Sequence, residues 1–484
     1  MGDRSSILVE GETVWRIATA GRLAFIVDGA DYFAALRDSL CRAQRSVLIL
    51  AWVIDSRLQM LRDGDEDGRP RELAAFLSGL VEERPELHIR IDCWDHSVIY
   101  TLDRELLSRS QLGWMSPEHL HFALSSHHPL GASLHEKVVV IDDEVAFIGG
   151  LDPGAGRWDT SEHRPDDPRR ETPAGEPYPP FHDLQLVVSG EAARALGEHA
   201  RRRWERTTGE TVEAVAAGSD PWPPTVDPAI EDVEVGIVRT RAAWEEEAEV
   251  RETERLHRRF VAEARHLVFI ENQYLTDEGV GGALAGRLAG EGPPEVIAVT
   301  SKASENWLEH VTMNGLRARW CRELFAADRE GRFGVYCPVV GDGPPITVHS
   351  KLFIVDDLLL YLGSANLANR SMTFDTECGL AIDAGSRSDV REAIRSLRQS
   401  LLAEHLGTTQ PVVAEREGEL SLKQTIEVLG GGRRTLAELP IDEQGIPAVL
   451  EPLAELADPR IFPSPAQLVR AVVGEDADGD EKLK

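Results

Sequence analysis

Cysteines are few in this chain, and their arrangement argues against a disulfide framework or a zinc site. The 484 residues include five cysteines, an odd number with no C-x-x-C pair among them. Such usage is typical of proteins in a reducing cytosol. We therefore expect a cytoplasmic protein that binds no metal and no other cofactor.

Long apolar runs are missing as well. The longest, residues 47–54, is far shorter than the roughly 20 residues that a membrane-spanning helix needs. Residues 1–5 lack the basic start of a signal peptide, and no apolar stretch follows them. We therefore expect the protein to contact a membrane only peripherally, at its surface.

Positive charge is scarce. Lys and Arg number 52 against 83 Asp and Glu, which gives a formal net charge of −31. A surface this acidic repels polyanions, so we expect no nucleic-acid partner. High solubility or adaptation to salt accounts for the same acidity equally well, so charge alone does not define the function.

What the sequence does contain is one motif in two copies. A His, any residue and a Lys are followed by four mostly apolar residues and an Asp. After six further residues come a Gly and a second small residue. The first copy consists of His135, Lys137, Asp142 and Gly149-Gly150, and the second of His349, Lys351, Asp356 and Gly363-Ser364. The copies lie 349 − 135 = 214 residues apart and share their internal spacing, which composition alone does not produce.

This duplicated motif suits phosphodiester chemistry without a metal. One imidazole can attack phosphorus while the other protonates the leaving oxygen, because the reference pKa of His, about 6.5, lies near neutral pH. Lys137 and Lys351 would neutralise the charge that builds on the phosphate oxygens, and Asn366 adds a neutral donor. The sequence does not decide which His attacks.

Other segments are duplicated in the same order. Residues 43–55 align with residues 264–276, and each segment places the end of a helix before an apolar, β-rich run. The motif strands, 138–141 and 352–355, are continuously apolar, as strands buried on both faces are. The pattern predicts an α/β fold with two similar α/β/α sandwich halves packed about a pseudo-twofold axis and the active site at the seam.

The same pattern divides the chain into four segments. We assign residues 1–217 to the first half, 218–230 to a Pro-rich linker, 231–405 to the second half and 406–484 to a C-terminal extension. In the extension we expect a helical stretch near residues 436–456 and a disordered, acidic tail over the last eleven positions.

In these motifs the chain resembles the phospholipase D superfamily, whose signature is H-x-K-x4-D-x6-G-S-x-N in duplicate. The second copy matches through Asn366, whereas the first ends in Gly-Gly-Leu-Asp at Asp152, as in eukaryotic-type members. Three further stretches are similar to motifs of that branch: I-E-N-Q-Y at 270–274, F-H-D at 181–183 and G-R-W-D at 156–159.

The resemblance implies a double displacement through a covalent phosphohistidine. It favours His135 as the nucleophile and His349 as the general acid. Each imidazole also needs a partner at its second nitrogen to fix its orientation. The resemblance suggests Asp183 as the partner of His135 and Glu377 as the partner of His349, so that each carboxylate follows its own motif.

Five more side chains are expected to contact substrate, because they belong to the matched motifs or end a matched strand: Asp152, Trp158, Asn272, Gln273 and Ser364. The aspartates of the two motifs, Asp142 and Asp356, are expected instead to be structural and to close the turn after each motif strand. Trp52 is expected in the core, where Trp usually lies.

The function implied by the resemblance is that of a phospholipase D or phosphatidyltransferase, which cleaves or exchanges the head group of a glycerophospholipid. Its partners would be a phospholipid at a membrane surface and a water or alcohol acceptor, and we expect a monomer. Two alternatives use the same residues: phosphatidyl transfer of the cardiolipin synthase type, and a metal-independent phosphodiesterase or nuclease. The charge of −31 argues against the nuclease, and the complete motifs argue against an inactive scaffold.

We predict that turnover does not require a divalent metal. No cluster of His, Cys or carboxylate side chains has metal-ligand spacing along the sequence, and two Lys side chains already serve the phosphate. Cleavage of a labelled phospholipid should proceed at the same rate in excess chelator and in added Mg²⁺ or Ca²⁺. A rate that collapses in chelator and returns when a divalent ion is added would contradict this prediction.

Overall fold

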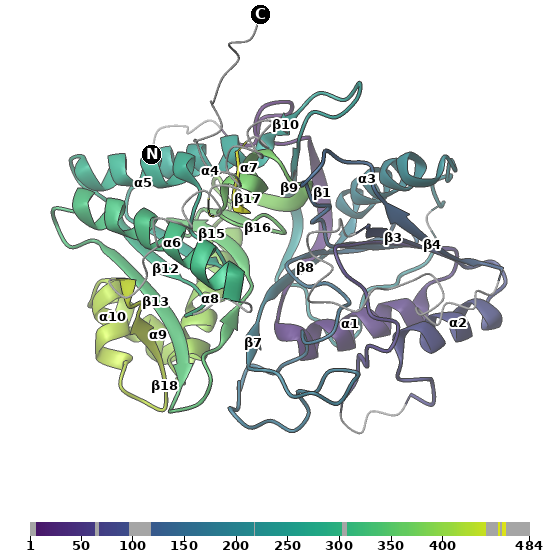
Figure 1. The fold of residues 1–484 in the computed structure, drawn as a ribbon, viewed down its shortest axis with the longest axis horizontal. Coiled ribbons are helices and arrows are strands. Elements are labelled where there is room, and N and C mark those ends of the chain that lie inside the picture. Colours follow the sequence, from purple (N-terminus) through teal and green to yellow (C-terminus); the bar gives the residue numbers. More distant parts are fainter. Residues whose placement is uncertain are drawn as a thin grey trace, which may run out of the picture.

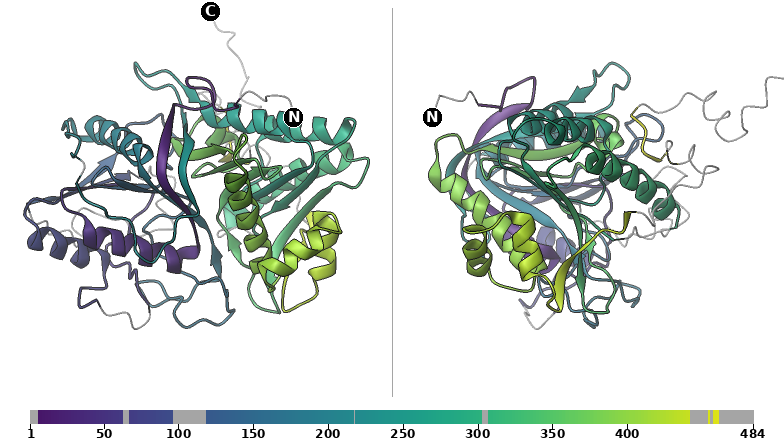
Figure 2. Two further views of the ribbon diagram at one scale, coloured as in Figure 1. Left: turned by 180° about the vertical axis from the view of Figure 1, so that it is seen from behind. Right: turned by 90° about the vertical axis from the view of Figure 1, so that its left-hand side faces the viewer.

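The computed structural model describes residues 6–62, 67–95, 118–216, 218–302, 307–441, 454 and 457–460. Figure 1 shows two lobes side by side, one built from the N-terminal part of the chain and the other from the C-terminal part, and Figure 2 shows the same lobes from behind. Helices cover strands in both lobes. The α/β fold expected from the sequence is confirmed.

The first lobe contains seven strands of the central sheet. Their bounds are Arg16–Val27 (β1), Ser46–Ala51 (β2), His88–Trp94 (β3), Leu120–Ser125 (β4), Val138–Ile141 (β5), Val145–Gly149 (β6) and Leu184–Gly190 (β8). Their order across the sheet is β1-β8-β6-β5-β2-β3-β4.

The second lobe repeats that arrangement. Its strands are Ile230–Arg241 (β9), Val250–Arg251 (β10), Leu267–Asn272 (β11), Glu295–Val299 (β12), Phe333–Val340 (β13), Lys351–Val355 (β15), Leu359–Gly363 (β16), Glu377–Asp383 (β17) and Arg434–Glu438 (β18). Their order is β9-β17-β16-β15-β11-β12-β13, with β18 added beyond β13 and β10 beside β9. Each strand of the first lobe thus has a counterpart at the same place in the second.

The two lobes share one sheet of 16 strands, because β1 and β9 pair along the boundary. This pairing is antiparallel and runs from Arg16 opposite Ile237 to Leu23 opposite Ile230. The sequence suggested two sandwiches in contact, whereas the structure has a single sheet that passes through both. The repeated strand order agrees with a duplication, and the pseudo-twofold axis stays a prediction.

Helices cover both faces of this sheet. One face carries Asp28–Arg42 (α1) and Leu73–Glu83 (α2) in the first lobe, and Glu252–Glu263 (α4), Glu278–Ala289 (α5) and Trp307–Ala327 (α6) in the second. The other face carries Glu191–Thr208 (α3), Ser388–His405 (α8), Gln410–Glu417 (α9) and Leu422–Leu429 (α10). A short helix, Asn369–Thr373 (α7), follows β16. None of the helices in the described ranges is long and apolar enough to cross a bilayer.

The motif strand β5 shows why its sequence is continuously apolar. Val138 and Val140 belong to the core beneath α3, whereas Val139 and Ile141 belong to the core beneath α1 and α2. All four side chains are buried, so neither face of the strand tolerates a polar residue.

The C-terminal extension belongs in part to the second lobe. β18 pairs antiparallel with β13, from Tyr336 opposite Glu438 to Val340 opposite Arg434. The expected helix near residues 436–456 is therefore wrong at its start, because the open edge of β13 accepts this segment as a strand. Most of the remaining residues of that stretch, and the acidic tail, lie outside the described ranges. Residues 218–229 form neither helix nor strand, and their role as a linker stays a prediction.

The two motif aspartates anchor neighbouring strands. Asp142 accepts hydrogen bonds from the backbone N–H groups of Gln44, Arg45 and Ser46, at 2.7 to 2.8 Å. Asp356 accepts the equivalent bonds from residues 265–267, at 2.7 to 2.9 Å. These contacts support the expected structural role. Each carboxylate therefore fixes the start of the strand beside its own in the sheet, which is β2 for Asp142 and β11 for Asp356, rather than only closing the turn after its own strand.

Candidate active site

In each motif, the segment just before the motif strand pairs with the backbone of the opposite lobe. Thr347–Val348 (β14) pairs with Phe181–His182 (β7) of the first lobe, and the N–H of His349 donates to the carbonyl of His182 at 2.8 Å. In the same way Leu134 bridges to Thr376, and the N–H of His135 donates to the Thr376 carbonyl at 2.8 Å. Each catalytic His is thus held on the backbone of the opposite lobe.

This crossing exchanges the carboxylate partners of the two imidazoles. Nδ1 of His135 lies 3.0 and 3.1 Å from the two carboxylate oxygens of Glu377. Nδ1 of His349 lies 2.6 Å from Oδ2 of Asp183. The assignment of Asp183 to His135 and Glu377 to His349 is therefore wrong. Each carboxylate directly follows the residue whose carbonyl binds the opposite motif, so it points at the opposite imidazole.

The small residue at the end of each motif lies against one of the two carboxylates. Gly150 lies against Asp183, and Ser364 contacts Glu377. Gly150 and Ser364 occupy equivalent places, because their N–H groups donate to the carbonyls of Leu184 and Cys378. Ser364 donates its hydroxyl to Glu377. A Cβ on Gly150 would lie 2.0 Å from Oδ1 of Asp183, so only glycine leaves room for that carboxylate. Ser364, expected to bind substrate, instead positions Glu377.

The two lysines are buried within the site and have different neighbours. Lys137 donates to the carbonyl of His135 at 3.0 Å and pairs with Asp152 at 3.1 Å. Lys351 donates to the carbonyl of His349, and its Nζ lies 3.5 Å from Oε1 of Gln273. Lys137 therefore has an ionic partner, whereas the contact of Lys351 with Gln273 is neutral.

Burial and the lysines keep both imidazoles neutral. Burial lowers the pKa of His135 well below its usual value, and Lys137 and Lys351 lower it further. Burial, Lys351 and Arg157 do the same to the pKa of His349. A neutral imidazole that donates its Nδ1–H to a carboxylate leaves a lone pair on Nε2, which is the form that a nucleophile or general base requires.

The carboxylates and Lys351 are also shifted toward their neutral forms. Burial raises the pKa of Asp183 to about 7. Burial, with the adjacent Asp375, raises that of Glu377 to about 8. Burial lowers the pKa of Lys351 to about 7. Apart from the Lys137–Asp152 ion pair, these groups are shifted toward their neutral forms, and an entering phosphodiester anion would favour the charged forms of Lys351 and of one imidazole.

Aromatic rings line the site beside both imidazoles. The ring of Trp52 lies 5.9 Å from that of His135, edge to face, and Nζ of Lys137 lies 5.7 Å from the Trp52 ring centre. The ring of Phe181 lies 5.3 Å from that of His349. Trp52 was expected in the core. The sequence does contain a signal for its position in the site: Trp52 directly follows β2, as Gln273 directly follows the corresponding strand β11.

Three of the expected substrate contacts turn out to be supports. Trp158 is buried in the core beneath α1, with Arg169 4.9 Å above its ring. Oδ1 of Asn272 accepts from the N–H of Leu367 at 3.0 Å. Asp152 divides its oxygens between Lys137 and the N–H of Trp52. Each of these side chains supports an element of the site through the contacts named, and direct contact with substrate stays a prediction for all three.

Two other side chains of the matched motifs are better placed to contact a substrate phosphate. Arg157, next to Trp158 in G-R-W-D, lies 4.8 Å above the ring of Phe181, and its positive charge helps to lower the pKa of His349. Asn366 is buried, and no described residue hydrogen-bonds to its Oδ1. A buried amide with an unsatisfied atom suits the phosphate-binding role expected of Asn366, which stays a prediction.

The described residues also include groups with metal-ligand spacing, but neither catalytic imidazole belongs to them. These groups centre on His182, the neighbour of Asp183, and bring together side chains from distant parts of the sequence. Local spacing in the sequence could not have revealed them.

Comparison with known proteins agrees with this geometry. The family model described as Phospholipase D matches residues 344–432, which contain the second motif. Phospholipase D A of Dictyostelium discoideum is 23% identical over 422 residues, and phospholipase D2 of Bos taurus is 22% identical over 467. These matches support the resemblance of the chain to the phospholipase D superfamily. The alignments cover 73% and 75% of this chain but only 32% and 49% of those relatives, so the chain spans a third to a half of their length.

One solved structure matches the fold of nearly the whole chain. The phosphatidylserine synthase of Haemophilus influenzae Rd KW20 aligns with a TM-score of 0.53 and 13% identity, over 89% of this chain and 91% of that one. At such low identity the likeness concerns the fold alone. It shows that this chain shares its architecture with a protein of similar length.

We predict that Lys351→Ala lowers kcat by about 10²- to 10³-fold, the usual effect of removing one donor to a developing oxyanion, with little change in Tm. Little stability is lost because burial already disfavours the charge of Lys351. Lys137→Ala should slow turnover similarly but lower Tm more, because it leaves the buried Asp152 carboxylate unpaired.

The double variant Lys137→Ala/Asp152→Asn is the matched control, since it removes both charges of that pair. It should regain Tm without regaining kcat. A Lys351→Ala protein that melts far below the wild type yet retains turnover would show that this lysine is structural. Circular dichroism melts and lipid cleavage assays on the same preparations provide both quantities.

Proposed function

We propose that this chain is a phospholipase D or phosphatidyltransferase that acts through a covalent phosphohistidine. The observation that carries the proposal is the pair of imidazoles, each buried against a carboxylate of the opposite lobe and flanked by a buried lysine. One imidazole serves as nucleophile and the other as acid and base. Neither role needs a metal at the phosphate.

In the first step Nε2 of His135 attacks phosphorus and the bond to the head-group oxygen breaks. His349, which takes up a proton and becomes an imidazolium when the phosphodiester anion binds, gives its Nε2 proton to the departing alkoxide, and His135 becomes a phosphoramidate linked to the lipid. Lys137, Lys351 and Asn366 hold the phosphate oxygens as negative charge builds on them. The assignment of His135 as the nucleophile follows the resemblance and is supported by its exposure: 13% of its side chain is accessible, against 7% for His349.

In the second step an acceptor hydroxyl attacks phosphorus and the bond to His135 breaks. Neutral His349 takes the proton of that hydroxyl, which restores the starting protonation states. Water as the acceptor yields phosphatidic acid, and an alcohol yields a new phosphatidyl ester. Glu377 and Asp183 stabilise whichever imidazole is cationic in each step.

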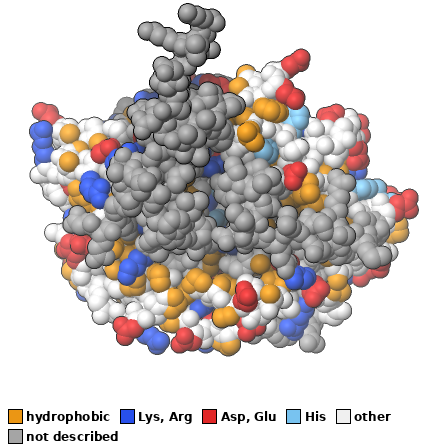
Figure 3. Space-filling view, viewed as in Figure 1, with side chains coloured by type: hydrophobic (Ala, Val, Ile, Leu, Met, Phe, Trp, Pro, Cys, Tyr) orange, Lys and Arg blue, Asp and Glu red, His pale blue; other side chains and the backbone are white. Residues whose placement is uncertain are grey.

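A phospholipid is the substrate that the remaining observations favour. The chain is strongly acidic, at −31, and Figure 3 shows acidic, basic and apolar side chains interspersed among the described residues of one face, without a basic field for a polyanion. The matched relatives are named phospholipases D. We propose that the protein acts peripherally at a cytoplasmic membrane surface, and as a monomer, because one chain supplies both histidines.

We predict that a primary alcohol in the assay diverts product from phosphatidic acid to the phosphatidyl-alcohol. A covalent intermediate can be intercepted by any small nucleophile that reaches it, whereas direct attack by activated water has no such branch point. Lipid products separated by chromatography at several alcohol concentrations would show the partition. Hydrolysis that continues with no alcohol product at any concentration would contradict the double displacement.

The same intermediate allows a direct assignment of the two histidines. His349→Ala, given a substrate with a good leaving group, should accumulate a base-stable phosphoryl adduct on His135, because it lacks the base for the second step. His135→Ala should accumulate none. Mass spectrometry of the peptides that contain each His would show the site. An adduct on His349 in the wild type would reverse the roles and keep the mechanism.

A further inference from the structure

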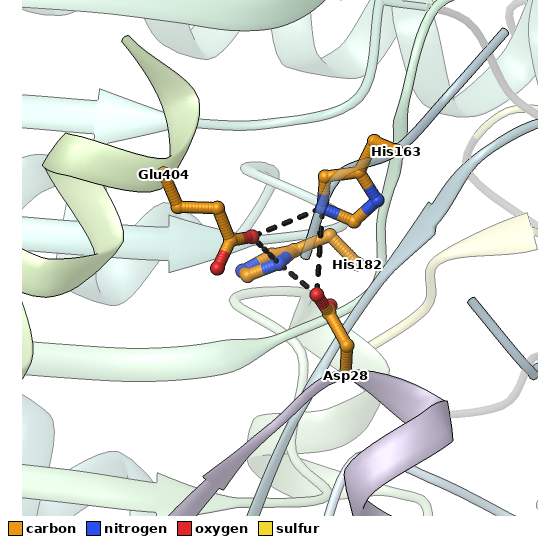
Figure 4. Close-up of side chains that lie close together, drawn as sticks. All are labelled: Asp28, His163, His182 and Glu404. Carbon is orange, nitrogen blue, oxygen red and sulfur yellow. Dashed lines mark hydrogen bonds and ion pairs between the residues drawn. The ribbon is translucent and has the colours of Figure 1, made fainter. Parts of the chain in front are cut away.

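A second cluster of titratable side chains lies next to the catalytic pairs and has no part in the chemistry proposed above. Asp28 begins α1, His163 lies in the loop after the G-R-W-D segment, His182 belongs to β7, and Glu404 lies near the end of α8. These four side chains point toward one another from different elements (Figure 4) and are at most 10% exposed.

The distances within this cluster are those of a metal site. Nε2 of His163 lies 3.0 Å from Oε1 of Glu404 and 3.5 Å from Oδ2 of Asp28. Nδ1 of His182 lies 3.0 Å from Oδ1 of Asp28 and 3.0 Å from the same Glu404 oxygen. Four ligands at 2.0–2.1 Å around a tetrahedral zinc ion are separated by about 3.3 Å, so an ion fits with small adjustments.

Protons alone leave this cluster incompletely paired. The two facing ring nitrogens, one on His163 and one on His182, carry at most one hydrogen each, yet they make four contacts with carboxylate oxygens. Oδ2 of Asp28 is buried without a hydrogen-bond partner. A buried carboxylate oxygen without a partner is costly, and a divalent cation would serve all four contacts at once.

The outer nitrogens of both histidines are arranged as they are around bound metals. Nδ1 of His163 lies 2.9 Å from Oδ2 of Asp159, and Nε2 of His182 lies 3.1 Å from Oε2 of Glu271. A metal-ligating His typically donates its second N–H to a carboxylate, which fixes the ring and leaves the other nitrogen free for the ion. Arg170 in turn holds Asp159 at 3.1 Å.

We propose that Asp28, His163, His182 and Glu404 bind one divalent transition-metal ion of the zinc class. Two imidazoles among the ligands favour such an ion over Mg²⁺ or Ca²⁺, which prefer oxygen. Four protein ligands leave no open position, as in structural sites. The ion would tie α1, the G-R-W-D loop and α8 to β7, and so hold the segment that carries Asp183. Its burial keeps it from chelators in solution, consistent with turnover in excess chelator.

Metal content of the full-length protein tests this proposal without reference to activity. The chain is produced in zinc-supplemented minimal medium, dialysed against chelator without unfolding, and measured by elemental analysis. About one zinc per chain is expected. His163→Gln and Glu404→Gln should each lose it. His257→Gln is the matched control, because His257 is equally buried but bonds only the Thr253 carbonyl and lies outside the cluster.

Cobalt substitution gives a second readout if a ligand variant fails to fold. Wild-type protein produced with Co²⁺ in place of zinc should show the intense visible absorption of four-coordinate cobalt, and His257→Gln should show the same band. A wild type that retains no zinc after dialysis and lacks the cobalt band would overturn the proposal. The cluster would then be held by hydrogen bonds and ion pairs alone. Zinc that persists in both ligand variants would overturn it as well. Neither result bears on the phosphohistidine chemistry.

Discussion

The exchange of carboxylates between the lobes is the interaction on which the rest of this site depends. Glu377 reaches His135 and Asp183 reaches His349 because each motif first pairs with the backbone of the opposite lobe, at Thr376 and His182. Neither lobe therefore contains a complete His–carboxylate pair of its own. The continuous sheet through β1 and β9 makes this possible, since it fixes the two lobes at the distance that the crossing segments require.

Burial is the main cause that shifts the pKa values of the two imidazoles and two carboxylates that the exchange brings together. Both imidazoles have lowered pKa values and both carboxylates raised ones, with burial as the largest cause in each case. The shift of these groups toward their neutral forms, with Lys137 paired to Asp152, avoids the cost of isolated buried charges. It also leaves the site ready for an anion, because a phosphodiester stabilises the cationic forms of Lys351 and of one imidazole at the moment they are needed.

The sequence identified the chemistry but not the connections. The duplicated motifs, the α/β fold and a structural role for Asp142 could be predicted, because local spacing and apolar runs encode them, but the neighbouring strand that Asp142 anchors could not. The pairing of Asp183 and Glu377 could not, since it depends on which lobe a strand end faces. Arg157 and Trp158 are neighbours in one motif, yet only the fold shows that Arg157 faces the site. Likewise, Asp28 and Glu404 lie 404 − 28 = 376 residues apart, and only the packing of α8 against β7 brings them together.

Double-mutant cycles on unfolding free energy test the exchange most directly. Asp183→Asn and Glu377→Gln are each combined with His135→Ala and His349→Ala, and the four coupling energies are obtained from denaturant unfolding. The account predicts coupling of about 1–3 kcal/mol for Asp183 with His349 and for Glu377 with His135, as for charge-assisted hydrogen bonds in contact. It predicts values within about 0.5 kcal/mol of zero for the two pairs within a lobe. Larger coupling within a lobe than across the boundary would contradict it.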